Sequence, residues 1–170
     1  MLRTLSAAIT LLLLYACQPS LKQDAPDLTR LDSLISTYLQ EKKIDSFLIT
    51  ADQKLSLLRN NPDSLYAWVN LNRYIINSLD VKSSGWPATR PYLENIITQA
   101  EKYPADTSLR RSLTFACAHW AFGYNSKYDQ PRDSMIRYYE KAIELNRITG
   151  ELSPADERYI YKRLGILYNI

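Results

Sequence analysis

The chain has 170 residues, and its 21 basic and 18 acidic side chains leave a net charge of only +3. A nucleic-acid surface needs a clustered basic face, which this balance does not supply. Four glycines are few for a phosphate-binding loop or an all-β fold, and one histidine with two cysteines is too few for a His/Cys metal site. The length suits a single domain.

The first seventeen residues differ from the rest of the chain. Arg3 is their only charge, and an apolar run from Leu5 to Ala16 follows it. A secretory signal typically has a short basic segment, then about ten apolar residues, and a small residue before its cleavage site. A membrane span needs about 20 apolar residues. Because the chain turns polar after Cys17, this segment is too short to span.

The segment Leu14-Tyr15-Ala16-Cys17 resembles the bacterial lipobox. The resemblance implies that residues 1–17 are a lipoprotein signal peptide, that Cys17 is lipidated, and that acyl chains anchor the exported protein to the bacterial cell envelope. Gln18 favours the outer membrane, on its periplasmic side. Two alternatives remain open: an ordinary signal cleaved after Ala16, and a cytoplasmic protein with a buried apolar first helix.

Residues 18–26 are polar and predict a flexible tether, and an all-helical domain is expected over 27–170. Apolar residues then recur at helical spacing. The expected helices have their first apolar or capping residue at Leu28, Ile44, Leu65, Leu93, Leu109, Met135 and Ser153. We expect a linker over 81–89 and a polar loop over 125–130. No stretch alternates with period 2, so the sequence predicts an all-α fold with about seven helices after the signal.

Several segments resemble the tetratricopeptide repeat, whose first helix reads Trp-x2-Leu-Gly-x2-Tyr. The first-helix pattern occurs as Tyr161-x2-Leu164-Gly165-x2-Tyr168 and begins again as Trp68-x2-Leu71. The second-helix pattern occurs over 133–145, with Tyr139 and Ala142 as its aromatic and small residues. The resemblance implies antiparallel helical hairpins stacked as a short solenoid, in which these residues pack the repeats. An ordinary helical bundle with chance matches is the alternative.

The last expected helix carries an apolar stripe that a following helix would normally cover. The stripe consists of Tyr161, Leu164, Leu167 and Tyr168, and the sequence stops at Ile170. Three explanations are open, in this order: the helix packs back as a cap, it docks on a partner or a second copy, or the reading frame is a truncated longer protein.

The sequence offers no set of catalytic residues. Cys117 and His119 lie two positions apart on an expected helix, so their side chains point about 200° apart and form no dyad. Glu140 and Glu144 lie one helical turn apart, which is typical of a solvated face. We therefore expect no enzyme, no metal and no cofactor.

Aromatic residues are the better indication of function. We predict Trp68, Trp86, Trp120 and Tyr124 as partner-binding residues, because aromatic anchors dominate interfaces and helical arrays bind segments on a concave face. Packing between helices is the alternative for each.

The predicted function is a lipid-anchored module that binds or scaffolds another envelope protein or peptide, with no nucleic acid involved. Self-association through the C-terminal helix is a further expectation. A truncated sensory or regulatory front half of a signalling protein, and a glycan-binding lipoprotein, are the alternatives.

Overall fold

The computed structural model describes residues 27–79, 86–122 and 132–169. Within these stretches the chain forms seven α-helices and one short 3-10 helix, and no strand. They are α2 (Leu28–Gln40), α3 (Ile44–Arg59), η1 (Pro62–Ser64), α4 (Leu65–Ser78), α5 (Trp86–Ala100), α6 (Thr107–Phe122), α7 (Arg132–Thr149) and α8 (Pro154–Tyr168). The predicted all-α fold is confirmed. The predicted signal peptide over 1–17 and the tether over 18–26 lie outside the described residues.

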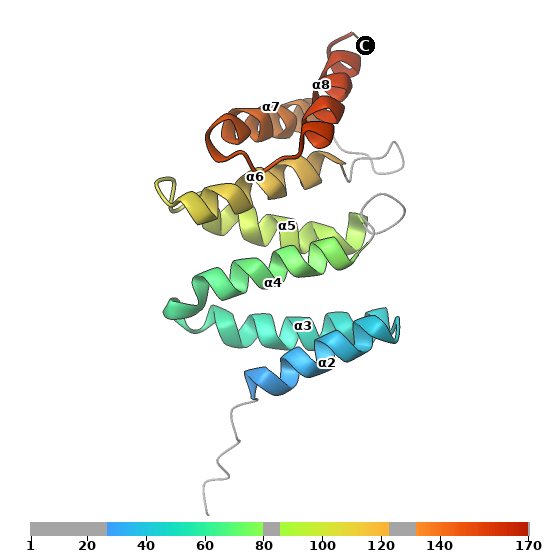
Figure 1. Cartoon of the computed structure of the whole chain (residues 1–170), viewed down its shortest axis with the longest axis vertical. Coiled ribbons are helices and arrows are strands. Elements are labelled where there is room, and N and C mark those ends of the chain that lie inside the picture. Colours follow the sequence, from blue (N-terminus) through green and yellow to red (C-terminus); the bar gives the residue numbers. More distant parts are fainter. Residues whose placement is uncertain (1–26, 80–85, 123–131, 170) are drawn as a thin grey trace, which may run out of the picture.

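The helices are stacked in chain order along the long axis of the molecule, with α2 at one end and α8 at the other (Figure 1). Each helix packs against the next one, and α4 also contacts α6. Contacts restricted to near neighbours are typical of a solenoid. The prediction of a stacked helical solenoid is therefore confirmed.

A continuous core runs through the stack. Nearly every helix contributes at least one side chain that is less than 2% exposed; examples are Phe47, Ile75, Leu93, Leu109, Tyr139 and Ile160. Burial is most complete on α6, where every residue from Ser112 to Ala118 is buried. Small side chains on this helix let α5 and α7 approach it from two sides, and the α6–α7 contact is the most extensive of the molecule.

Side-chain caps explain where several helices begin. The Asp106 carboxylate accepts a hydrogen bond from the Leu109 N–H at 2.9 Å at the start of α6. The Ser153 hydroxyl accepts one from the Asp156 N–H at 3.1 Å, which confirms the predicted start of α8. Such caps satisfy N–H groups that have no partner inside the helix.

The start of α5 differs from the prediction. Residues 86–89 were expected in a linker, yet α5 begins at Trp86 and continues through Pro91. Pro87 is the second helical residue, where the N–H that proline lacks would have no partner inside the helix. Proline near the first turn therefore did not mark a break.

The last helix packs with only part of its apolar stripe. Leu164 and Leu167 are buried, whereas Tyr161 and Tyr168 are 49% and 55% exposed. Figure 1 shows α8 steeply inclined to the other helices. Of the contacts between consecutive α-helices, the α7–α8 contact is the least extensive. The helix thus packs back on its predecessor while one side of it stays uncovered.

Candidate functional site

Two hollows lie on the face of the stack that α2, α4 and α6 share. The first has a volume of about 460 Å³, and its lining includes Asp32, Ser36, Lys54, Asn70 and Tyr74. The second has a volume of about 390 Å³, and its lining includes Tyr66, Asn70, Arg73, Ser108, Arg111 and Glu151. Because Asn70 lines both, the hollows adjoin along α4. We call the combined surface the α4 groove.

Side chains one helical turn apart on α4 form the middle of the groove. Tyr66, Asn70 and Tyr74 follow each other at intervals of four residues, so they share one face of the helix. The two tyrosines are 50% and 43% exposed, and Asn70 is also exposed. The Asn70 amide can both donate and accept hydrogen bonds, as a peptide group does. The arrangement presents two aromatic surfaces with a peptide-like group between them.

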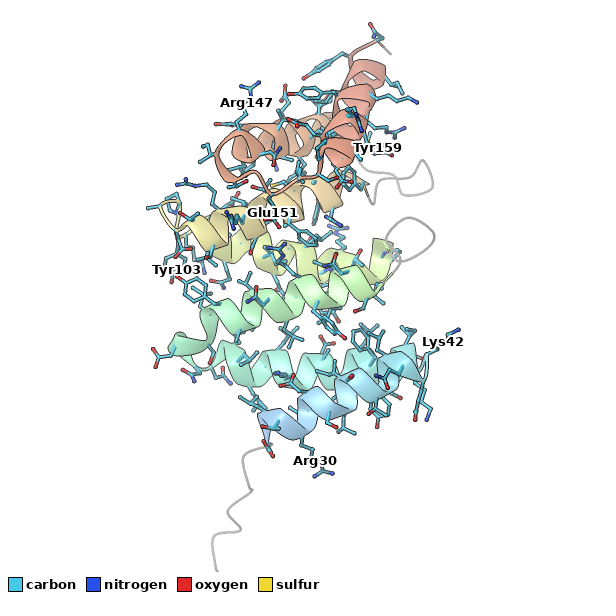
Figure 2. All side chains as sticks on the ribbon, in the orientation of Figure 1. Arg30, Lys42, Tyr103, Arg147, Glu151 and Tyr159 are labelled. Atoms are coloured by element: carbon cyan, nitrogen blue, oxygen red, sulfur yellow. The ribbon has the colours of Figure 1, made fainter. Side chains whose placement is uncertain are left out.

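Arg73 forms the wall of the second hollow and is held from three sides. Its guanidinium lies 4.6 Å from the centre of the Phe115 ring, donates to the Ser112 hydroxyl at 3.4 Å and forms an ion pair with Glu151. Glu151 belongs to the connection between α7 and α8, which runs along α6 (Figure 2). The wall of the groove is therefore fixed before any ligand arrives.

The charges of the groove are partly neutralised within it. Lys54 of α3 pairs with Asp32 of α2, as Arg73 does with Glu151. Arg111 on α6 is exposed and forms no ion pair with any residue that the structure describes. It is the cation in the groove that remains open to a ligand.

Tyr66 is anchored at the edge of the groove by a carboxylate. Its hydroxyl donates to Asp106 at 2.5 Å, and the Leu109 N–H donates to the same carboxylate. These bonds favour the charged carboxylate, so the pKa of Asp106 is lowered and that of Tyr66 is raised. The Tyr66 ring therefore has a defined position above the second hollow.

The thiol and the imidazole of α6 face different surroundings. Cys117 is fully buried, and burial raises the pKa of its thiol to about 12, so the thiol stays protonated at neutral pH. The His119 ring is 3.0 Å from the Phe115 carbonyl oxygen and stacks on the Phe115 ring. In the described stretches, no three side chains of His, Cys, Asp or Glu are grouped to hold a metal ion.

None of the helices from α2 to α8 has both the length and the apolar character that crossing a membrane requires.

Two of the three tryptophans predicted to bind a partner, Trp68 and Trp120, are buried. Trp68 and Trp120 are only 5% and 7% exposed, and the Trp120 ring lies 5.1 Å from that of Tyr138 on α7. For these two residues the structure matches the alternative of packing between helices, because their rings fill the space between neighbours. The Trp86 side chain, all of Tyr124, and Cys17 lie outside the part of the chain that the structure describes.

The residues predicted to pack the repeats divide into two groups. Leu71, Tyr139, Ala142 and Leu164 are buried, and the Tyr139 hydroxyl donates to the Ala121 carbonyl of α6 at 2.9 Å. Burial raises the pKa of Tyr139 to about 12, so its hydroxyl remains a donor at neutral pH. Tyr161, Gly165 and Tyr168 are exposed together on α8.

Sequence reasoning missed the groove residues Tyr66, Asn70 and Arg111. The four-residue spacing of Tyr66, Asn70 and Tyr74 was the available signal, since it places them on one face of α4. The tryptophans give a misleading signal in the sequence, because a large aromatic side chain favours burial and binding alike. Only the packing of the helices shows which aromatic residues are buried and which are exposed for binding.

Comparison with protein-family models, with curated proteins and with solved structures found no match.

Proposed function

We propose that the chain is a lipid-anchored helical-repeat protein of the cell envelope that binds an extended segment of another envelope protein in the α4 groove. The observation that carries this proposal is the pair of hollows that adjoin at Asn70 on one face of three helices. Binding, rather than bond-making, is the role that this surface supports.

The dimensions of the groove favour an extended segment. Packed helices lie about 8–10 Å apart, and α2 contacts α4 less extensively than α6 does, so a ligand that crosses from α2 over α4 to α6 spans at least roughly 20 Å. An extended chain covers about 3.3 Å per residue. About six residues of a partner therefore fit, with their peptide groups within reach of Asn70 and the hydroxyls of Ser36 and Ser108.

The lipid anchor rests on the lipobox-like segment that ends at Cys17. Cells grown with an alkyne-tagged fatty acid are expected to label the wild-type protein and not the Cys17→Ser variant. Mass spectrometry of the mature N-terminus is expected to find acylated Cys17 as the first residue. Label retained by Cys17→Ser, or an unacylated protein that still begins with Met1, would contradict the anchor.

Site-specific photo-crosslinking in living cells tests the groove. A photoreactive amino acid at Ser36, Asn70 or Ser108 is expected to give an adduct with the same protein from all three sites. Matched controls carry it at Thr98 on α5 and Arg147 on α7, which are exposed and line neither hollow. Equal adducts at the control sites, or none in the groove, would rule out this binding surface.

Once a crosslinked segment is identified, its affinity tests the role of single side chains. Arg111→Ala and Asn70→Ala are each expected to raise Kd about tenfold, the effect of losing an interface contact worth about 1.4 kcal/mol. Thr98→Ala is the control and should leave Kd unchanged. An unaltered Kd for both groove variants would show that the segment binds elsewhere.

A further inference from the structure

One side of α8 is uncovered and has a shape that suits a second helix. This uncovered face consists of Tyr161, Gly165 and Tyr168, which follow each other at intervals of four and three residues. Both rings are about half exposed, and a Cβ atom added at Gly165 would meet nothing within 4 Å beyond its own helix. The face is a saddle at Gly165 with a tyrosine on either side.

The equivalent face of α4 is covered. Trp68, Leu71, Asn72 and Ile75 have the same spacing as Tyr161, Leu164, Gly165 and Tyr168, and each is at most 8% exposed. The Asn72 side chain accepts a hydrogen bond from Asn95 of the following helix, α5, at 3.1 Å. In α4 this face therefore holds the next helix of the stack.

The same arrangement recurs on α6. Thr114 is fully buried, and its hydroxyl lies 3.1 Å from that of Thr149 at the end of the following helix, α7. Of α4, α6 and α8, only α8 has no following described helix that packs against it. The surface of α8 thus corresponds to surfaces of α4 and α6 that the following helix covers.

Gly165 is unexplained by the packing of a single chain. Glycine inside a helix costs about 1 kcal/mol relative to alanine. No positive φ angle requires it, in contrast to Gly150, and the space beside it is open. A helical glycine does permit the close approach of another backbone. This observation is independent of the exposed tyrosines and points to the same use.

We propose that the uncovered face binds the same face of a second copy, so that two α8 helices pack antiparallel and cross at Gly165. In such an isologous contact each patch meets itself. An antiparallel crossing at Gly165 sets Tyr161 of each copy level with Asn169 of the other, and Lys162 level with Tyr168. The four tyrosines then surround the two glycines.

Charge complementarity favours this pairing. The Tyr168 hydroxyl donates to Glu140 of α7, so a carboxylate lies beside the ring that Lys162 of the other copy approaches. Lys162 is exposed and has no ion pair among the described residues. The two Lys162 residues are six positions apart in this register, or about 9 Å along the helix axis, so they do not oppose each other.

None of the described helices covers this surface of α8. This helix is the last of the stack and stands steeply away from the others (Figure 1). The α4 groove lies on α2, α4 and α6, so the two surfaces are separate and this inference does not rest on the proposed function. A dimer would carry two grooves.

Sedimentation velocity of the full chain, in a mild detergent matched in density by the solvent, tests the dimer. The wild type is expected to change from monomer to dimer as its concentration rises. Gly165→Leu fills the saddle without harming the helix and is expected to raise the dissociation constant at least about tenfold. Thr98→Leu, which places the same side chain on an exposed face of α5, is the control and should dimerise like the wild type.

Disulfide crosslinking tests the register. A disulfide needs Cβ atoms about 3.5–4.5 Å apart, so Gly165→Cys is expected to form a covalent dimer under mild oxidation. Lys162→Cys should not, because its partner lies about 9 Å further along the axis. The wild type measures the background from its own cysteines.

Three results would overturn the proposal. They are a monomer at all concentrations up to about 1 mM, a dimer that Gly165→Leu does not weaken, and equal crosslinking of Gly165→Cys and Lys162→Cys. Circular dichroism of each variant shows whether it remains folded, and Gly165→Cys keeps the test valid should Gly165→Leu fail to fold.

Discussion

At the scale of single residues, the Tyr139 hydroxyl joins the two helices that share the largest contact. It is fully buried and donates to the Ala121 carbonyl at 2.9 Å. Tyr139→Phe removes the donor and leaves the buried Ala121 carbonyl without this hydrogen bond, which costs about 1–3 kcal/mol. We expect the free energy of unfolding in urea to fall by that amount with an unchanged m-value.

Tyr103→Phe is the matched control for this prediction. The Tyr103 side chain is 48% exposed, so the loss of its hydroxyl to water is expected to change the free energy of unfolding by less than about 0.5 kcal/mol. Equal losses in the two variants would show that the Tyr139 hydroxyl does not stabilise the α6–α7 contact.

Asp106 is expected to make the free energy of unfolding depend on pH in the acid range. Its pKa in the folded chain is lowered, first by the Tyr66 hydroxyl and then by the Leu109 N–H. A lowered folded pKa stabilises the chain above the unfolded value of about 3.9, and this stabilisation is lost as pH falls through the folded pKa. Tyr66→Phe is therefore expected to lose less stability than the wild type as the pH falls below about 4.

Urea midpoints across that acid range, compared between variants, measure the effect. Tyr74→Phe is the control, since it lies two turns further along α4 and its hydroxyl has no hydrogen bond in the described structure. If both variants lose as much unfolding free energy as the wild type when the pH falls, the contact between Tyr66 and Asp106 does not determine the stability at acid pH.

At the scale of elements, α8 depends on its first cap. The Ser153 hydroxyl accepts from the Asp156 N–H and donates to the Asp156 carboxylate at 2.7 Å. Ser153→Ala is expected to cost about 1 kcal/mol of unfolding free energy, whereas Ser153→Thr keeps a hydroxyl that can both accept and donate and should cost little. Thermal unfolding of the two variants is the measurement, and equal melting temperatures would contradict the role of the cap.

The sequence predicted most elements because their signals are local. Apolar residues at helical spacing located all seven helices, and Ser153 with Pro154 located the start of α8. The start of α5 was missed because Gly85 and Pro87 suggested a break, although a helix tolerates proline in its first turn.

The candidate site was harder to predict because exposure depends on neighbours distant in sequence. Helical spacing places Trp68 and Tyr66 on different faces of α4, but only the packing shows that Trp68 is buried and that Tyr66 is half exposed. Glu151 reaches Arg73 across 78 positions of the sequence, a pairing that only the fold creates. A groove built from three helices therefore becomes visible only when the helices are stacked.

At the scale of the whole molecule, stability is expected to vary along the stack. Inner helices pack on two neighbours, whereas α2 and α8 each pack mainly on one. Amide hydrogen exchange should therefore be slowest in α6 and faster in α2 and α8, since local opening costs less where fewer contacts break. Mass spectrometry of peptides from each helix measures this gradient, and uniform protection would contradict it.

The connection between α7 and α8 has a mechanical consequence. Because the helices pack in series, a pulling force along the stack acts on each interface in turn, and the least extensive one, between α7 and α8, separates first. The ion pair between Arg73 and Glu151 clamps the connection before α8 to α4. A force on α8 is therefore transmitted to α4 through this ion pair as well as to α7.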